Sequence, residues 1–325
     1  MKSLKLHITG GITLLMLLAA CGGDEESAAE GGDGSGDGDG DGPVIGMSFP
    51  EADHGFLGAI ITNAQHEIEE QGYDHIMVTA SDPNQQANDI DDLISQNVDI
   101  IVMLPTESDA MTPVAENIEA ADIPLVVVDR ELESDNYTHL VKGDNLGIGQ
   151  EAGEYFVEEL DGEGQVVEII GTPSSVTDLR TQGFEESIEG SDIEVITQQS
   201  GEFQTEQSLS VMEDVLTAHS EIDAVYTHDD EMALGVLQAI EEAGRDDIQF
   251  VTGAGGHKGV YGLIQEDETV VEATFYYSPL MVKDGIQVAV DVLEGNPPEE
   301  QDIVLEATRI TVENVDEFYD EDAVY

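Results

Sequence analysis

The feature that most constrains the fold is a regular alternation of short apolar runs with segments of helical periodicity. In the first half of the chain, runs rich in Val, Ile and Leu predict strands at residues 44–48, 76–79, 100–104 and 124–129. Helical spacing of apolar residues predicts helices between them, at residues 58–71, 85–96 and 109–121. Apolar runs without polar alternation indicate strands buried on both faces. The pattern therefore predicts right-handed βαβ units around a parallel sheet.

A second series of the same kind follows a predicted helix at residues 146–160. Its strands are expected at residues 166–170, 194–198, 224–227, 249–253 and 272–276, and its helices at residues 179–188, 205–218, 231–243 and 279–293. Two doubly wound parallel-sheet domains of the α/β class account for this length better than one sheet. The first domain is expected to comprise residues 44–143 plus 278–305, and the second residues 144–277 plus 306–325. Ligands bind outside the carboxyl ends of such strands, which places the expected site in the cleft between the domains.

The charge of the chain is strongly negative, with 72 acidic residues against 9 basic ones and a net charge of −63. Nucleic acid is excluded as a partner, because binding to phosphates needs clustered Lys and Arg. The acidic residues are spread over the predicted helices, where their repulsion destabilises a compact state in dilute buffer. At ~1 M salt the Debye length falls to about 3 Å, which removes most of that repulsion. The composition predicts a protein from a salt-loving organism, and the regular apolar periodicity argues against a disordered chain.

The N-terminus predicts secretion. Lys2 and Lys5 precede an apolar stretch at residues 8–20, which is shorter than the about 20 residues that span a bilayer. The stretch ends in LAAC, which resembles the lipobox of secreted lipoproteins, where the signal is cut before a cysteine that carries the lipid. Residues 1–21 are therefore predicted to be a signal peptide with lipidation at Cys21, and the protein is expected on the outer face of the cytoplasmic membrane. An unmodified cysteine after an ordinary cleavage site is the alternative.

The segment after the predicted lipobox, residues 22–43, consists mostly of Gly, Asp, Glu and Ser. Such a composition lacks apolar residues for packing and predicts a flexible, self-repelling tether. A calcium loop of the EF-hand type is disfavoured, because its twelfth position would fall on Ser48, Pro50 or Ala52 instead of a carboxylate.

Side chains that follow the predicted strands are the candidates for a ligand site. Arg130 and Arg180 stand out, because removal of the signal peptide leaves only seven basic residues in the chain. The planar guanidinium group of arginine presents several N–H donors in a rigid geometry, which suits hydrogen bonding to a ligand. Each arginine could instead form a structural salt bridge. Carboxylates and arginines make charge-assisted hydrogen bonds to sugar hydroxyls, and aromatic rings stack on the apolar faces of a sugar. For Phe56 and Phe203, ordinary core packing is the alternative.

Motifs for catalysis are absent from the sequence. It contains no HExxH, CxxC or GxSxG, and the glycine-rich residues 253–259 fit neither of the common phosphate-binding loops. His54, His228 and His257 are too widely spaced to specify a metal site. We therefore expect a binding protein without catalytic activity, metal or cofactor.

The chain resembles the ribose-binding-protein family of periplasmic binding proteins, the solute receptors of ABC sugar importers. The resemblance extends from residue 44 to about residue 309. It is carried by SDPNQQANDIDDLISQNVDIIVMLPTESDAM, ADIPLVVVDRE, GDNLGIGQEAGEYF and AVYTHDDEMALGVLQAIEEAG. It implies two α/β domains of the type I periplasmic binding fold, joined by three crossovers that form a hinge.

The resemblance also implies a set of ligand-binding residues. Ser48, Asp129, Arg130, Arg180 and Phe203 match the family pattern, and Phe56 matches one of two stacking aromatics, the second being replaced by Leu57. The chain departs from the pattern at other family positions, which carry His54, Asp229, Gly255 and Tyr277. These departures fall on the side chains that hydrogen-bond to the hydroxyl groups of the sugar in the family pattern. The resemblance therefore implies a monosaccharide or related polyol but does not specify ribose.

The implied role is delivery of a sugar to an ABC permease and its ATPase by a monomeric protein, held at the membrane only through its lipid. A sensory receptor of the same fold, coupled to a kinase or chemotaxis receptor, is the main alternative. A surface enzyme acting on sugars is disfavoured by the missing motifs. A repressor of the lactose-repressor type is disfavoured because a secretion signal stands where a helix-turn-helix would be needed.

Overall fold

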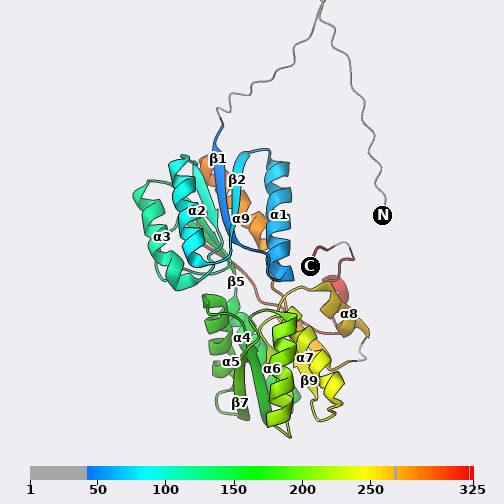
Figure 1. Cartoon of the computed structure of the whole chain (residues 1–325). Helices are drawn as coiled ribbons and strands as arrows, with labels where there is room; N and C mark the ends of the chain where they lie inside the picture. Colours follow the sequence, from blue (N-terminus) through cyan, green and yellow to red (C-terminus); the bar gives the residue numbers. More distant parts are fainter. Residues whose placement is uncertain (1–41, 267–268, 322) are drawn as a thin grey trace, which may run out of the picture. The chain divides into compact units, whose positions relative to one another are not determined.

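The computed structural model describes residues 42–266, 269–321 and 323–325. Its N-terminal lobe is a parallel sheet with strand order β11-β5-β4-β3-β1-β2. The strands are β1 (Val44–Pro50), β2 (Asp74–Ala80), β3 (Ile100–Met103), β4 (Leu125–Val128), β5 (His139–Gly143) and β11 (Asp302–Leu305). Helices α1 (Gly55–Gln71) and α9 (Met281–Leu293) cover one face, and helices α2 (Pro83–Ser95) and α3 (Ser108–Ala120) cover the other (Figure 1).

The C-terminal lobe repeats this arrangement, with strand order β12-β10-β9-β8-β6-β7. Its strands are β6 (Glu163–Ile170), β7 (Asp192–Ser200), β8 (Ala224–Thr227), β9 (Phe250–Thr252), β10 (Val271–Phe275) and β12 (Arg309–Ile310). Helices α4 (Asn145–Glu159) and α5 (Ser175–Ile188) pack together, as do α6 (Thr205–Ala218) and α7 (Asp230–Ala243). Helix α8 (Lys258–Glu266) packs against β10 and the short 3₁₀ helix η1 (Val315–Glu317).

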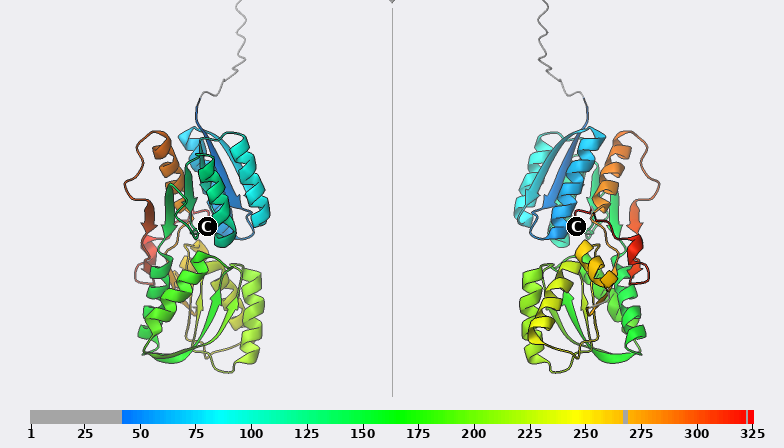
Figure 2. Two further views of the ribbon diagram at one scale, coloured as in Figure 1. Left: turned by 90° about the vertical axis from the view of Figure 1, so that its left-hand side faces the viewer. Right: turned by 90° about the vertical axis from the view of Figure 1, so that its right-hand side faces the viewer.

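The chain passes between the two sheets three times. It does so from β5 to α4, from β10 to α9 and from β11 to β12, and the side views of Figure 2 show both sheets with these connections on one side. The predicted fold class, two doubly wound sheets joined by a three-strand hinge, is confirmed. The residue limits given above for the two domains stay a prediction.

Four short elements were not anticipated from the sequence. Strand β5 contains His139 and Lys142, so its apolar pattern is interrupted. Helix α8 contains Gly259 and Gly262, which weaken helical propensity. Strands β11 and β12 lie at sheet edges, where only one neighbour fixes them, and β12 pairs antiparallel with β10, so the second sheet is parallel except at this edge.

Helices begin close to the carboxyl ends of strands because polar residues cap them there. The side chain of Asp82 accepts hydrogen bonds from the amides of Asn84 and Gln85 at the start of α2. Ser174 caps α5 and Asp229 caps α7 in the same way. A side-chain cap satisfies backbone donors that the helix leaves free, typically for ~1 kcal/mol. These caps therefore fix the helix ends at the edge of each sheet where ligands bind.

None of the helices in the described part of the chain is long and apolar enough to cross a membrane. The predicted signal peptide, Cys21 and nearly all of the predicted tether lie outside the described residues.

Candidate functional site

A pocket lies between the two lobes. Its lining includes eight of the ten ligand-binding residues expected from the sequence, together with Leu57 and Val176: His54, Phe56, Asp129, Arg130, Arg180, Phe203, Asp229 and Tyr277. The N-terminal lobe contributes the turn after β1, the start of α1 and the turn after β4. The C-terminal lobe contributes α5 and the turns after β7 and β8, and Tyr277 comes from the crossover between β10 and α9. Residues that are up to about 220 positions apart thus converge because both sheets direct their strand ends to the same place.

Two lining residues have backbone conformations that are unusual for their residue types. Asp129 has a φ of 73° and Phe203 a φ of 59°, both in the left-handed region. This region is uncommon for residues other than glycine, and strained positions cluster at functional sites. The turn at Asp129 is held by its own amide, which donates to the carbonyl of Val141 at 2.8 Å. These turns direct the two side chains into the pocket.

Asp129 is the central carboxylate of the pocket. It is 4% exposed, and its Oδ1 accepts a hydrogen bond from the Tyr277 hydroxyl. Burial raises the pKa of Asp129, while the positive charges of Arg130 and Arg180 and the tyrosine hydrogen bond oppose that rise. Tyr277 remains neutral, because burial and the nearby carboxylate raise the pKa of its hydroxyl well above the usual value.

The two arginines are buried and held by neutral oxygen atoms. Arg130 donates from Nη1 to the backbone carbonyls of Pro105, at 3.1 Å, and Thr106. Arg180 donates from Nε to Oδ1 of Asn145 at 3.0 Å and from Nη1 to the carbonyl of His228. Its buried Nη2 has no hydrogen-bond partner among the described residues. Because a buried guanidinium nitrogen is normally hydrogen-bonded, Nη2 is a donor available to a ligand.

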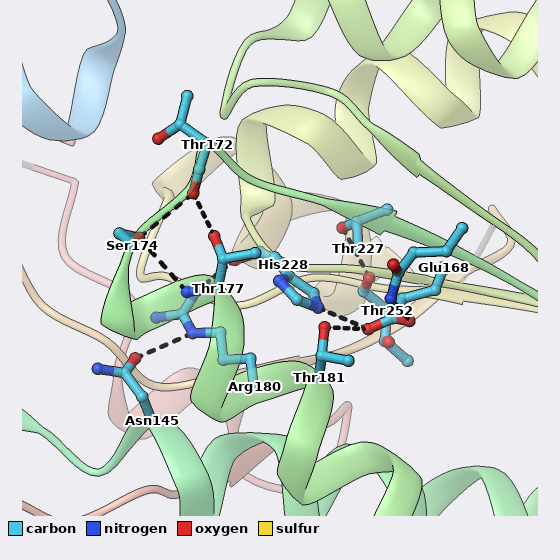
Figure 3. Close-up of polar contacts among 11 residues, drawn as sticks. Asn145, Glu168, Thr172, Ser174, Thr177, Arg180, Thr181, Thr227, His228 and Thr252 are labelled. Carbon is cyan, nitrogen blue, oxygen red and sulfur yellow. Dashed lines mark hydrogen bonds and ion pairs between the residues drawn. The ribbon is translucent and has the colours of Figure 1, made fainter. Parts of the chain in front are cut away.

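A second polar layer lies behind Arg180 (Figure 3). His228 is fully buried, and its Nε2 lies 2.9 Å from Oε1 of Glu168, which also accepts from Thr181 Oγ1 at 2.9 Å. Burial lowers the pKa of His228, so its neutral ring donates to the carboxylate. Burial would raise the pKa of Glu168, but the hydrogen bonds that it accepts lower it overall. This network fixes the backbone carbonyl that holds Arg180, so His228 supports the pocket from behind.

Asp229, from the C-terminal lobe, is the second carboxylate that lines the pocket. Its Oδ1 caps α7 through the amide of Glu231 at 2.7 Å, and its Oδ2 accepts from the hydroxyl of Tyr325 at 3.2 Å. The Tyr325 ring also packs edge-on against Phe56, with centroids 5.6 Å apart. Tyr325 therefore contacts residues of both lobes. Neither Tyr325 nor Val176 was expected from the sequence, since neither directly follows a predicted strand.

Two expected site residues lie away from the pocket lining. Ser48 is fully buried in β1, where its hydroxyl accepts from Nε2 of Gln86 at 3.3 Å. Gly255 packs so closely against Asp230 that an added Cβ would lie 2.8 Å from its Oδ2. Both residues support neighbours of the site. Among the described residues, no group of three or more His, Cys, Asp and Glu could hold a metal ion.

The protonation of Asp229 gives a testable dependence on pH. Burial, with a further contribution from Asp230 and Glu231, raises the pKa of Asp229 from 3.8 to about 7. The folded state favours the protonated form of Asp229. The stability that this preference contributes is present in full below pH 3.8 and is lost as the pH rises through 7. An amide does not ionise and avoids the cost of a buried negative charge. Asp229→Asn is therefore expected to gain stability relative to the wild type between pH 5 and 8. The complete effect is roughly 4 kcal/mol, since one pKa unit corresponds to about 1.4 kcal/mol.

Denaturant unfolding in molar salt at several pH values measures this effect. Asp247→Asn is the matched control, because its pKa of about 2, lowered by the hydrogen bonds from Arg245, leaves it ionised throughout that range. The control variant should differ from the wild type by the same amount at pH 5 and pH 8. A difference for Asp229→Asn that is equally constant would contradict the assignment of a raised pKa.

Two doubly wound lobes with a buried polar pocket between them define a two-lobed binding protein of the type I periplasmic class. Residues 45–297 match the periplasmic binding protein domain family. The ribose import binding protein of Bacillus subtilis is 34% identical over 254 residues, which cover 77% of this chain and 82% of the relative. The chain belongs to the periplasmic binding protein family. Proteins of this family bind a substrate without converting it, so the prediction of a protein without catalytic activity is confirmed.

Solved structures agree with this fold. A solute-binding protein of an ABC transporter from Bacillus halodurans, with bound myo-inositol, superposes with a TM-score of 0.81 at 27% identity, covering 89% of this chain and all of the other. The fructose-binding periplasmic domain of a hybrid two-component system superposes with a TM-score of 0.78 at 29% identity, covering 85% of this chain and 92% of the other.

Proposed function

We propose that this chain is the extracytoplasmic solute-binding protein of an ABC importer and binds a monosaccharide or related polyol between its lobes. The observation that carries the proposal is the composition of the pocket, where buried carboxylates, a buried arginine with a free donor and aromatic rings converge from both lobes. The resemblance to the ribose import binding protein of Bacillus subtilis supports the same ligand class.

The chemistry of the pocket suits a polyhydroxylated ligand. Hydroxyl groups donate to carboxylates such as Asp129, and they accept from the free Nη2 of Arg180. Hydrogen bonds with a charged partner are roughly twice as strong as neutral ones, and a ligand with several hydroxyls can make several of them. Phe203 offers an apolar surface at 7% exposure for the carbon skeleton. The ligand residues are then His54, Phe56, Asp129, Arg130, Arg180, Phe203, Asp229 and Tyr277, with Ser48 and Gly255 behind them.

Delivery of the ligand follows from the hinge. A ligand that contacts both lobes favours their closed arrangement, because only there are all its contacts made. We propose that an ABC permease, acting with its ATPase, recognises the faces beside the cleft in that state. A lipid on Cys21 and the acidic segment at residues 22–43 would hold a monomeric protein at the outer face of the cytoplasmic membrane. The net charge of −63 suits a cell surface in concentrated salt.

The second candidate function is sensing. It is favoured by the similarity to the fructose-binding periplasmic domain of a hybrid two-component system. Deletion of the gene distinguishes the two roles once the ligand is known. Import predicts that cells lose uptake of the labelled ligand. Sensing predicts that uptake persists while the transcriptional or chemotactic response to the ligand is lost.

A melting-temperature screen tests the binding function. The secreted chain without residues 1–21 is heated in molar salt with glycerol, pentitols, pentoses, hexoses, myo-inositol and nucleosides. A ligand at 100 times its Kd stabilises the native state by about 2.7 kcal/mol, which raises Tm by several degrees. We expect an increase with one or two polyols or sugars. Cooperative unfolding without an increase for any sugar or polyol would contradict the proposed ligand class.

A further inference from the structure

Tyr277 lies at the centre of the pocket, in the crossover between β10 and α9. Its side chain is 5% exposed, and both its ring and its hydroxyl group have partners. The ring of Phe56 stacks on it with centroids 5.5 Å apart and planes inclined by 22°. The guanidinium carbon of Arg180 lies 4.4 Å from the ring centroid. The hydroxyl group donates to Asp129.

These three partners are the groups that the proposed function assigns to a sugar ring. A sugar in the pocket would stack on an aromatic face, accept hydrogen bonds from an arginine and donate hydroxyls to a carboxylate. Tyr277 itself stacks on Phe56, lies against the guanidinium of Arg180 and donates to Oδ1 of Asp129. A cation over an aromatic ring and a stacked aromatic pair are both stabilising contacts when they are buried. The tyrosine ring is therefore held in the place that a sugar ring needs.

The packing around Tyr277 fixes the position of its ring. Gly143, the last residue of β5, faces the ring edge so closely that a Cβ there would lie 2.2 Å from Cε2 of Tyr277. Only a residue without a side chain allows the ring to lie there, because such a distance is far below van der Waals contact. Gly143 therefore provides the space that the tyrosine ring occupies.

The space left in the pocket is small and continues outward. The inner cavity is about 30 Å³, room for roughly two or three water molecules. It adjoins a larger hollow of about 310 Å³, which shares His54, Leu57, Arg130 and Phe203 with it. Pockets for small molecules commonly measure about 300 Å³ or more. A ligand therefore finds a narrow inner end at Asp129 and Arg180 and a wide outer end beyond Phe203.

We infer that Tyr277 is a specificity-determining residue that excludes a closed sugar ring and selects an open-chain polyol. A linear chain of hydroxylated carbons can place one end beside Asp129 and Arg180 and extend past Phe203 into the outer hollow. A pyranose or furanose ring is as wide as the tyrosine ring and cannot share this place with it. The inference rests on the proposed function and narrows its ligand class to acyclic polyols.

The test compares each pentitol, which cannot close into a ring, with the cyclic aldose of the same configuration. Xylitol and D-xylose share carbon number and hydroxyl pattern, and ribitol and D-ribose form a second such pair. Calorimetric titration of the wild type in molar salt is expected to give a Kd for the pentitols at least about tenfold lower than for the matching pentoses, a discrimination typical of steric fit. Tyr277→Gln retains a donor for Asp129 but vacates the ring position, and it is expected to bind D-xylose or D-ribose more tightly than the wild type does.

Tyr277→Phe is the matched control. It keeps the ring and removes the hydroxyl, so it should retain the preference for pentitols even if all affinities fall. A wild type that binds the pentoses as tightly as the pentitols would overturn the inference while leaving the proposed function intact. So would a Tyr277→Gln variant that folds cooperatively and loses the pentitols without gaining the pentoses. Failure of the cooperatively folded wild type to bind any pentitol or pentose would overturn this inference, and failure with every sugar and polyol of the melting screen would overturn the proposed ligand class as well.

Discussion

Arg180→Met is expected to raise the Kd of the bound polyol or sugar at least about a hundredfold. The substitution removes the free Nη2 donor and the positive charge beside Asp129 and the Tyr277 ring. Loss of one partner from a buried charged hydrogen bond costs roughly 2–5 kcal/mol of binding energy, and a hundredfold change corresponds to about 2.7 kcal/mol. Asn145 and the His228 carbonyl also lose a donor, so the free energy of unfolding should fall by a few kcal/mol. Calorimetric titration and denaturant unfolding measure both effects.

Arg245→Met is the control for this variant. Arg245 also has two kinds of partner, the carboxylate of Asp247 at 2.5 Å from Nη2 and the carbonyls of Leu216 and His219, but it is not among the pocket-lining residues. It should lose some stability and keep the wild-type Kd. Arg180→Lys separates charge from geometry, because an ammonium group lacks the planar fork that reaches Asn145 and His228 together. An unchanged Kd for Arg180→Met would remove Arg180 from the ligand site.

A second large effect is expected from the salt concentration. The sequence has a net charge of −63, and lowering the salt from ~1 M to 0.1 M lengthens the Debye length from about 3 Å to about 10 Å. Repulsion between carboxylates on neighbouring helices then acts over longer distances and favours the unfolded chain. We expect Tm to fall by roughly 10 °C or more when the salt is lowered over this range, equivalent to about 3 kcal/mol of stability. Circular dichroism melting curves at graded sodium chloride concentrations measure the change.

Sucrose provides the control for charge screening. It stabilises folded proteins by exclusion from their surface and does not screen charges. In dilute buffer, sucrose should recover only a small part of the stability that sodium chloride gives. Equal recovery with sucrose would show that surface exclusion, and not repulsion between carboxylates, limits stability in dilute buffer.

Arg309 illustrates how this chain uses its few cations. Its guanidinium lies 3.1 Å from Glu151, 4.0 Å from Glu154 and 2.7 Å from Glu158, all on α4. One charge from the edge strand β12 thus offsets three on a single helix face. Exposed ion pairs contribute little individually, but a cation shared by several like charges also reduces the repulsion among them.

The sequence predicted the fold well because buried parallel strands leave a strong signal. Strands such as β1, β3 and β4 are almost entirely buried, and their unbroken apolar runs follow from that burial. The edge strand β11 has alternately exposed residues, and α8 contains Gly259 and Gly262, so neither produces a comparable pattern. Elements that depend on tertiary contacts at the rim of a sheet were therefore missed.

The sequence predicted those site residues that follow the carboxyl ends of strands. Asp129, Arg130 and Asp229 directly follow strands, and parallel sheets bring such residues together whatever their side chains are. Tyr325 contacts the lining residues Phe56 and Asp229 because the C-terminal segment folds back, with its carbonyl accepting from the Lys258 amide at 3.2 Å. The inward orientation of Tyr277 depends on the space above Gly143, which a pattern of residue types does not encode.

The three crossings between the sheets determine when each lobe can be completed during synthesis. Residues 145–275 supply five of the six strands of the C-terminal lobe in one continuous stretch, but the N-terminal lobe needs α9 and β11 from beyond residue 280. A lobe whose sheet edge and covering helix come last exposes apolar surface until nearly the whole chain has emerged. For the export that the proposed function requires, this delay is an advantage, because translocation through a membrane channel needs a chain that has not yet folded.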